Sequence, residues 1–346
     1  MVVAAPPGPR TEDDLDEQLS RPTPGVGEAL AALGGDLVFL GAGGKIGPTM
    51  ARMAARALAE VGSSSKVIAV SRYREEGVRE RLESYGVATA SVDLSEPQAY
   101  GDLPEAAGVF YLAAMKFGTT GAEHETWWSN AAIPALVASR YRGIPTLVYS
   151  TGNVYPLTPL HHGGSKENDP TGPVGEYAQS CLARERMFTY AAKTWGTPAT
   201  IFRLNYACEL RYGVLVDLAH TILAGNPVDI TMPAANVVWQ GDSSAWALRS
   251  IELASTDPTI VNATGPEIVS VRAAATELGR LLGREVTFTG AEASDALLSD
   301  SSVLHAAYGY PTVPVRTLMA WVAEWVGSGG RQLAKATKFQ RRDGAY

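Results

Sequence analysis

With 346 residues, a formal net charge of −7 and 46% hydrophobic against 19% charged residues, the chain is long and apolar enough to bury a large core. The negative net charge argues against a nucleic-acid partner. The two cysteines, Cys181 and Cys208, form neither a disulfide framework nor a metal-ligand spacing. No apolar run has the length of a membrane span or the context of a secretion leader. We therefore expect a folded, reduced, cytoplasmic protein that binds no metal, membrane or nucleic acid.

The first 34 residues are predicted to be an N-terminal extension. Residues 1–10 are rich in proline and alanine, which indicates a mobile tip. Residues 11–19 carry five acidic side chains on a short predicted helix. We expect this helix to present a solvated acidic face at the surface.

From residue 35 to residue 204, compact apolar runs alternate with helical stretches. The predicted strands are 36–40, 66–70, 88–92, 108–112, 146–150 and 199–203. The predicted helices among them are 50–61, 126–140 and 177–195. Apolar strands separated by helices indicate parallel pairing with both faces of the sheet covered. The sequence therefore predicts an α/β fold whose dinucleotide-binding domain is a Rossmann-type, doubly wound parallel sheet.

The regular alternation relaxes after residue 204. Residues 205–326 are predicted to be a smaller α/β region that mainly binds the substrate, with some segments returning to the Rossmann domain. Helices are expected at 214–224, 243–254, 271–282 and 315–326, and short strands near 228–230, 259–262 and 285–288. The basic C-terminal tail, residues 327–346, is expected to be solvated, with folding back over a neighbouring chain or a substrate cleft as the alternative.

A glycine-rich segment directly follows the first predicted strand and precedes a helix. It reads Gly41-Ala-Gly-Gly44-Lys45-Ile46-Gly47. The first glycine of the spacing permits a tight turn, the second lets the backbone approach a pyrophosphate, and the third lets helix and strand pack closely. The phosphates then meet the N–H groups of the helix N-terminus. A P-loop is excluded because the lysine is followed by isoleucine rather than serine or threonine, so the segment predicts a dinucleotide site.

The end of the second predicted strand indicates which dinucleotide is bound. An NAD site usually offers an acidic residue there to the ribose 2′-hydroxyl, whereas an arginine accommodates the 2′-phosphate of NADP. This sequence has Ser71-Arg72 at that place, with Arg74 close by. We therefore expect NADP, with NAD as the alternative.

Further motifs occur in an order that resembles the extended short-chain dehydrogenase/reductases, the NAD-dependent epimerase/dehydratase family, over about residues 36–326. The resemblance implies an enzyme with four more groups of cofactor contacts. Asp93 and Leu94 would bracket the adenine, and Ala113 and Ala114 would form the turn beside the nicotinamide. Asn130 matches a polar position in the following helix, and Asn205, within Arg203-Leu-Asn-Tyr206, belongs to the turn that closes the nicotinamide pocket.

The same resemblance implies a catalytic pair. The segment Tyr149-Ser-Thr151-Gly-Asn is similar to the strand that carries the family's catalytic serine or threonine, which places that role on Thr151. Tyr177 takes the place of the catalytic tyrosine, on a helix beside the cofactor. Its phenol would exchange a proton with a substrate oxygen held by Thr151, while hydride moves to or from the nicotinamide.

The sequence departs from the family inside the catalytic motif. The usual Tyr-x-x-x-Lys reads Tyr177-Ala-Gln-Ser-Cys181, so the lysine that binds the nicotinamide ribose and favours the tyrosinate is missing. Three explanations stay open. In the first, Lys116 supplies the cation at the catalytic site and contacts the cofactor. In the second, the reaction runs in the reducing direction, for which a protonated tyrosine is suited. In the third, the protein is a redox sensor that binds the dinucleotide without turnover.

Features of the family's nucleotide-sugar enzymes are missing as well. The Asp-Glu pair of the dehydratases is replaced by Gly152-Asn153, and the stretches 234–242 and 289–300, where epimerases hold a diphosphate with arginines, contain none. We expect an NAD(P)-dependent oxidoreductase or epimerase for a secondary alcohol or ketone of a non-nucleotide, carbohydrate-like molecule, with a nucleotide-sugar epimerase as the alternative. The expected substrate contacts are Thr151, Asn153, Asn205, Arg211, Trp239 and Gln240. Relatives dimerise through helices that correspond to 126–140 and 177–195, so a homodimer is expected.

Overall fold

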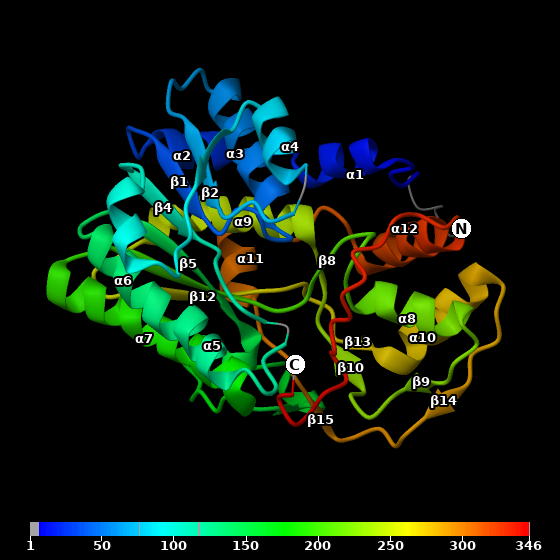
Figure 1. Ribbon diagram of the computed structural model, residues 1–346. Helices are drawn as coiled ribbons and strands as arrows, with labels where there is room; N and C mark the ends of the chain where they lie inside the picture. Colours follow the sequence, from blue (N-terminus) through cyan, green and yellow to red (C-terminus); the bar gives the residue numbers. More distant parts are fainter. Residues whose placement is uncertain (1–6, 76, 117, 346) are drawn as a thin grey trace.

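The computed structural model describes residues 7–75, 77–116 and 118–345, and a single seven-stranded sheet lies at its centre (Figure 1). The strand order is β12-β7-β5-β4-β1-β2-β3, and all neighbouring pairs are parallel. The strands are β1 (Leu37–Leu40), β2 (Val67–Ser71), β3 (Ala88–Ser91), β4 (Gly108–Tyr111), β5 (Thr146–Thr151), β7 (Ala199–Leu204) and β12 (Thr259–Ala263). The order reverses at β1, so the predicted doubly wound sheet is confirmed.

Helices cover both faces of this sheet (Figure 1). Successive side chains of a strand point to opposite faces; Phe39 belongs to one core and Val38 to the other. The first core is closed by α2 (Val26–Ala31), α3 (Gly47–Glu60), α4 (Val78–Ser84), α9 (Gln240–Arg249) and α11 (Ser302–Tyr308). The second core is closed by α6 (Ile133–Arg140) and α7 (Gly175–Trp195).

The helix predicted at 126–140 is interrupted. It consists of α5 (Glu123–Trp127), a π-helical turn at Trp128–Ala132, and α6. The side chain of Asn130 in this turn bonds the backbone of Met115 at both its N–H and its carbonyl, each at 2.9 Å. Such turns often occur at functional sites. The homodimer expected on α5, α6 and α7 stays a prediction.

The C-terminal half adds a separate core around α8 (Val214–Leu223), α10 (Val271–Leu282) and α12 (Val315–Gly327). Its short strands pair two by two: β10 (Ala234–Ala235) with β13 (Val269–Ser270), β11 (Val238–Trp239) with β8 (Ala207–Cys208), β14 (Phe288–Thr289) with β9 (Val228–Asp229), and β15 (Asp295–Ala296) with β6 (Thr158–Pro159). Short 3₁₀-helical segments occur at Pro97–Asp102, Gly152–Val154, Leu160–His162 and Ser250–Leu253. Strand β12 joins the main sheet, so part of the region after residue 204 does return to it.

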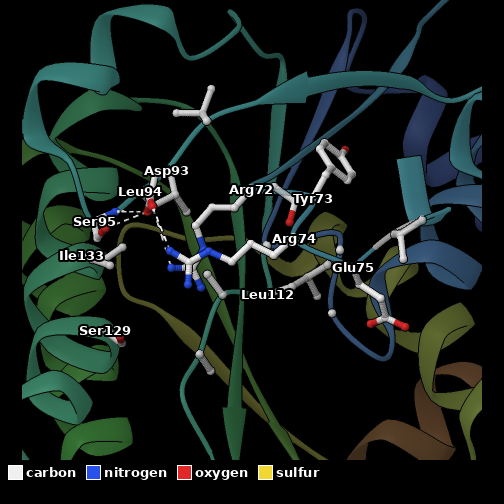
Figure 2. A pocket seen from close by; sticks show the side chains of 18 residues that line it. Arg72, Tyr73, Arg74, Glu75, Asp93, Leu94, Ser95, Leu112, Ser129 and Ile133 are labelled. Atoms are coloured by element: carbon white, nitrogen blue, oxygen red, sulfur yellow. Dashed lines mark hydrogen bonds and ion pairs between the residues drawn. The ribbon is translucent and has the colours of Figure 1, made fainter. Parts of the chain in front are cut away.

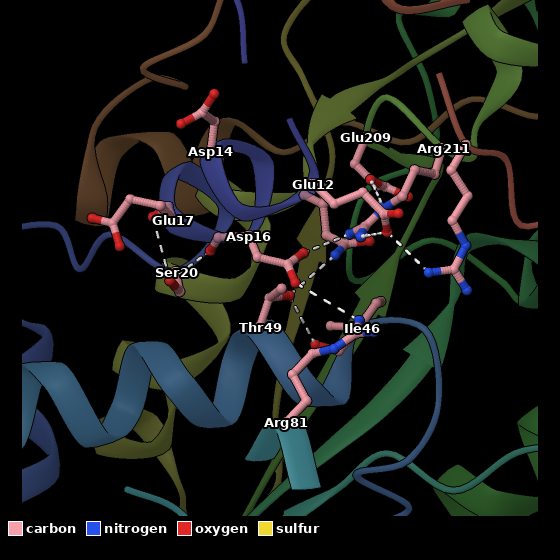
Figure 3. A network of polar contacts seen from close by, with 12 residues as sticks. Glu12, Asp14, Asp16, Glu17, Ser20, Ile46, Thr49, Arg81, Glu209 and Arg211 are labelled. Carbon is pink, nitrogen blue, oxygen red and sulfur yellow. Dashed lines mark hydrogen bonds and ion pairs between the residues drawn. The ribbon is translucent and has the colours of Figure 1, made fainter. Parts of the chain in front are cut away.

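The N-terminal helix α1 (Glu12–Leu19) is only in part the solvated acidic face that its sequence indicates, because Asp13 and Asp14 are exposed and its other acids are paired (Figure 3). Asp16 is buried, and its Oδ1 accepts a hydrogen bond of 2.9 Å from Arg211. Glu17 pairs with Arg52 and with a second arginine of α3 at 2.9 and 3.0 Å. The expectation was wrong for Asp16 and Glu17 because they meet arginines from distant parts of the chain. Of the predicted mobile tip, residues 1–6 lie outside the described residues.

The C-terminal tail is also not solvated. It runs between the main sheet and the α8–α10 layer, shown in red in Figure 1. Thr337 donates to Asp217 of α8 through its backbone N–H and its hydroxyl, at 2.8 and 2.6 Å. Phe339 is buried in the C-terminal core, and Arg342 pairs with Asp295. The tail therefore folds back along a cleft, as the alternative expected. It is held there by the buried ring of Phe339 and by the polar contacts of Thr337 and Arg342.

No described helix has the length and apolar character needed to cross a membrane.

Candidate active site

Two adjoining cavities open at the carboxyl edge of the sheet, where the strand order reverses around β1. Their volumes are about 360 and 320 Å³. Both are lined by Gly41, Gly44, Leu112 and Ala114. This edge, at the switch point of a doubly wound sheet, is where such folds bind their ligands.

The glycine-rich loop has the geometry of a phosphate cradle. Gly41 has a φ of 84°, and a Cβ atom there would lie 2.6 Å from the backbone nitrogen of Ala113. A Cβ atom on Gly47 would collide with the backbone of Ala42, so this glycine lets the start of α3 pack closely against the turn that follows β1. Helix α3 begins at Gly47 without a side-chain cap and without an acid in its first turn. Its N-terminus therefore suits the pyrophosphate of a dinucleotide.

Figure 2 shows the first cavity, where the guanidinium groups of Arg72 and Arg74 turn toward Asp93. They lie 3.8 and 3.7 Å from its carboxylate. Burial alone would raise the pKa of Asp93, but hydrogen bonds from Ser95 and the two arginines outweigh burial and lower it. Ser71 and Leu94 complete this end of the cavity. The residues predicted to surround the adenosine half thus line one cavity.

The second cavity contains Thr151, at the end of β5, and Tyr177, in the first turn of α7. The hydroxyl of Tyr177 is hydrogen-bonded to Thr151 and to Cys181. Thr151 also donates to the Asn153 side chain at 3.0 Å and accepts from the Asn153 N–H at 3.2 Å. Burial, the largest cause, raises the pKa of Tyr177 well above its ordinary value of 10. The phenol is therefore protonated at neutral pH and able to donate.

Arg184 lies two helical turns beyond Tyr177 and also lines the second cavity, and sequence reasoning missed it. It is 3% exposed and donates at 2.8 Å to the Tyr149 carbonyl and at 2.8 Å to Asn130. Its Nε has no hydrogen-bond partner among the described residues. Its positive charge partly offsets the burial that raises the pKa of Tyr177. The spacing of seven residues, which places both side chains on one helix face, is the signal that could have found it.

Two lysines extend into the same cavity. Lys45 donates from Nζ to the Ala207 carbonyl at 3.0 Å, and this Nζ lies 3.7 Å from the ring centroid of Tyr212. The Lys116 Nζ lies 6.0 Å from the ring centroid of Tyr206. Both side chains are half-buried, and removal of their ammonium groups from water, the largest cause, lowers the pKa of each to about 8. Ile46 and Asn205 line the same cavity.

Four of the expected contacts lie outside both cavities. Asn130 is fully buried and holds the segment after β4 against α7, where it also bonds Ser180 at 3.0 Å. Arg211 binds Glu209 and Asp16, each at 2.9 Å. Trp239 packs edge-on against another tryptophan, and Gln240 donates to a threonine of α3 at 3.3 Å. Arg211, Trp239 and Gln240 thus contact other parts of the protein and do not line either cavity, and their expected contacts with a substrate stay a prediction.

The described residues contain no group of three histidine, cysteine, aspartate or glutamate side chains placed to hold a metal ion.

Comparisons with known proteins agree with this geometry. The sequence profile of the NAD dependent epimerase/dehydratase family matches residues 37–208, which include the glycine-rich loop and both Thr151 and Tyr177. A search of curated proteins finds no significant match.

Among solved structures, MoeE5 in complex with UDP-glucuronic acid and NAD is similar with a TM-score of 0.69 at 19% identity, over 85% of this chain and 100% of that one. UDP-glucose 4-epimerase from Thermotoga maritima, solved with UDP-glucose, has a TM-score of 0.68 at 17% identity, over 85% and 99%. The dTDP-glucose 4,6-dehydratase DesIV from Streptomyces venezuelae, solved with NAD, has a TM-score of 0.71 at 17% identity, over 84% and 96%. These likenesses show a common fold. With the profile match and the ordered motifs, the chain belongs to the NAD dependent epimerase/dehydratase family of enzymes.

Proposed function

We propose that the protein is an NAD(P)-dependent oxidoreductase or epimerase that acts on a secondary alcohol or ketone of a small carbohydrate-like molecule. The observation that carries this proposal is the hydrogen bond between Thr151 and Tyr177 inside a cavity that adjoins the glycine-rich loop. A hydroxyl pair in this position can hold a carbonyl or alcohol oxygen and exchange a proton with it.

The roles of the chain's own residues follow from their contacts. When bound, the dinucleotide supplies a hydride acceptor or donor. Thr151, which Asn153 orients, holds the substrate oxygen. Tyr177 donates a proton to that oxygen when a ketone is reduced and takes it back when an alcohol is oxidised. Because burial keeps Tyr177 protonated, the site favours the reducing step as its starting reaction.

The size of the cavity supports a small substrate. A cavity of about 320 Å³ must admit the nicotinamide end of the cofactor as well as the substrate, and Lys335 and Thr337 of the C-terminal tail line it. The alternative, a nucleotide-sugar epimerase, is favoured by the similar solved structures that contain UDP-sugars.

Transfer of deuterium from the nicotinamide ring tests the proposal. The protein is incubated with NADPH or NADH deuterated at nicotinamide C4 and with panels of sugars, sugar acids, sugar phosphates and UDP-sugars, and products are analysed by mass spectrometry and chromatography. Deuterium in a product, or an epimer formed with cofactor bound, supports the proposal. Tight dinucleotide binding without either result supports a redox sensor, and no dinucleotide binding contradicts the proposed site.

The preference for NADP is proposed from the first cavity and predicts a change on removing its arginines. Serine in place of both Arg72 and Arg74 is expected to weaken NADPH binding about 10- to 100-fold and to leave NADH binding unchanged, because each guanidinium can donate charged hydrogen bonds to a 2′-phosphate. Fluorescence titration of both cofactors measures this. Arg79→Ser, which breaks an exposed pair with Glu83, is the control. Equal NADPH and NADH affinity in the unaltered protein would indicate an NAD enzyme.

We further propose that Arg184, rather than Lys116, compensates for the missing lysine by favouring the tyrosinate. Arg184→Met removes a positive charge beside Tyr177, so the pKa of the phenol should rise further. The pH profile of kcat/KM for alcohol oxidation, which needs the phenolate, should then move toward higher pH. Arg184→Lys should restore the position of the profile. A fall in rate at every pH without this displacement would assign Arg184 a structural role only.

A further inference from the structure

Charge is distributed unevenly around the second cavity. The chain has a net charge of −7, yet the described residues that line this cavity include no aspartate or glutamate. Its four basic side chains are Lys45, Lys116, Arg184 and Lys335. A cavity with this lining attracts an anion and repels a cation.

Arg184 is engaged behind the catalytic pair, whereas Lys45 and Lys116 enter from the glycine-rich loop and from the segment after β4. Burial lowers the pKa of Lys45, and the positive charge of Lys116 lowers it further. At a pKa of about 8, both side chains still carry charge at neutral pH. Two like charges in one confined space cost free energy, which an anion between them would recover.

The nearest carboxylates are engaged elsewhere. Glu209, which acts on Lys45, is bound by Arg211 at 2.9 Å. Asp217, which acts on Lys116, accepts two hydrogen bonds from Thr337 of the tail. Neither carboxylate lines the cavity. An incoming anion therefore meets no acidic side chain among the described lining residues.

The phosphates of the cofactor are not the anion in question. They fit the backbone N–H groups at the start of α3, whereas the Nζ of Lys45 is turned away to the Ala207 carbonyl and the ring of Tyr212, close to the start of α8. Lys116 points to the neighbouring ring of Tyr206. Both ammonium groups thus lie toward the C-terminal half, and Lys335 of the tail lines the same cavity.

We propose that Lys45 and Lys116 form an anion subsite, and that the substrate is a sugar acid or sugar monophosphate whose carboxylate or phosphate binds there while its secondary alcohol or ketone meets Thr151 and Tyr177. This inference rests on the proposed function and gives it a substrate class. It also explains why a lysine stands within the glycine-rich loop, where its side chain contributes nothing to the turn.

Amine-selective acetylation with residue-resolved mass spectrometry tests the subsite without any substitution. The probes are inorganic phosphate, glucuronate, glucose 6-phosphate and neutral glucose, each added to NADPH-saturated protein at constant ionic strength. We expect phosphate and at least one charged sugar to protect Lys45 and Lys116, and glucose to leave both reactive. Lys193, which lies at the surface beside Asp257, is the internal control and should react equally throughout. Failure of all anions to protect the two lysines would overturn the proposal.

Substitution then measures the contribution of each charge. Lys45→Gln and Lys116→Gln are each expected to weaken binding of the protecting anion about 10- to 100-fold, as for a lost hydrogen bond between charged groups. Lys193→Gln should change nothing. The relative affinities of glucuronate and glucose 6-phosphate distinguish a carboxylate from a phosphate. If UDP-glucose binds most tightly and the lysine variants do not weaken it, the anion subsite is wrong.

The two proposals fail in different ways. Deuterium transfer to neutral sugars alone would retain the proposed function and overturn the anion subsite. Protection of Lys45 and Lys116 by anions without any hydride transfer would retain the subsite and contradict the enzymatic proposal.

Discussion

Tyr177→Phe is expected to lower kcat/KM about 10²- to 10⁴-fold, the range for removal of a general acid–base group. The substitution deletes only the hydroxyl that meets Thr151, in a side chain that is otherwise buried. Binding of the dinucleotide should be nearly unchanged, because the glycine-rich loop and the start of α3 supply its phosphate contacts. Steady-state kinetics and a cofactor fluorescence titration on the same preparation measure the two quantities.

Tyr190→Phe provides a matched control. Tyr190 lies on the same helix but is 56% exposed and lines neither cavity. The same chemical change there should leave both turnover and cofactor binding unaltered. If Tyr177→Phe kept the turnover of the unaltered protein, the acid–base role would belong to another group in the cavity, and the proposed chemistry would be wrong.

The sheet and the phosphate cradle could be predicted from the sequence because their signals are local. The run Leu37–Leu40 is apolar at every position, as a strand buried on both faces requires, and it is buried throughout. Gly41 and Gly47 follow at a spacing that only a strand–turn–helix unit needs, and the structure shows the contacts that forbid a side chain at each. Short helices gave weaker signals, and α4 (Val78–Ser84) was not predicted.

The rest of the site depends on contacts between distant segments. Arg211 was expected in the substrate pocket, but its partner Asp16 lies 195 positions away in the chain. The tail looked solvated because its basic residues are obvious in the sequence, whereas its anchor Phe339 is a single residue. The break in the helix at 126–140 directly precedes Pro134, which has no N–H to donate one turn back, so this part was visible in the sequence. The side chain of Asn130, in contrast, bonds a segment that no local pattern connects to it. Periodicity cannot reveal such pairings.

Loss of one partner of the buried Arg203–Glu185 pair is expected to destabilise the protein by about 3–5 kcal/mol. Both side chains are at most 2% exposed, and the guanidinium binds the carboxylate through two hydrogen bonds of 2.9 and 2.7 Å. Among the described residues, Arg203→Met leaves the buried carboxylate of Glu185 with the hydroxyl of Ser150, at 2.6 Å, as its remaining side-chain hydrogen-bond partner. Chemical denaturation of the unaltered protein and the variant, with midpoints compared at equal slope, measures the loss.

The double variant Arg203→Met, Glu185→Leu separates the cost of an unpaired charge from the value of the pair. Removing both charges leaves no buried ion, so most of the lost free energy of unfolding should return. The pair joins β7 to α7, and Ser150 ties it to β5, the strand that ends in Thr151. Because α7 carries Tyr177, we expect the double variant to recover stability while its turnover stays below that of the unaltered protein. Equal stability of the single variant and the unaltered protein would show that the pair contributes nothing. Full turnover in the double variant would show that the pair does not set the distance between the hydroxyls of Thr151 and Tyr177.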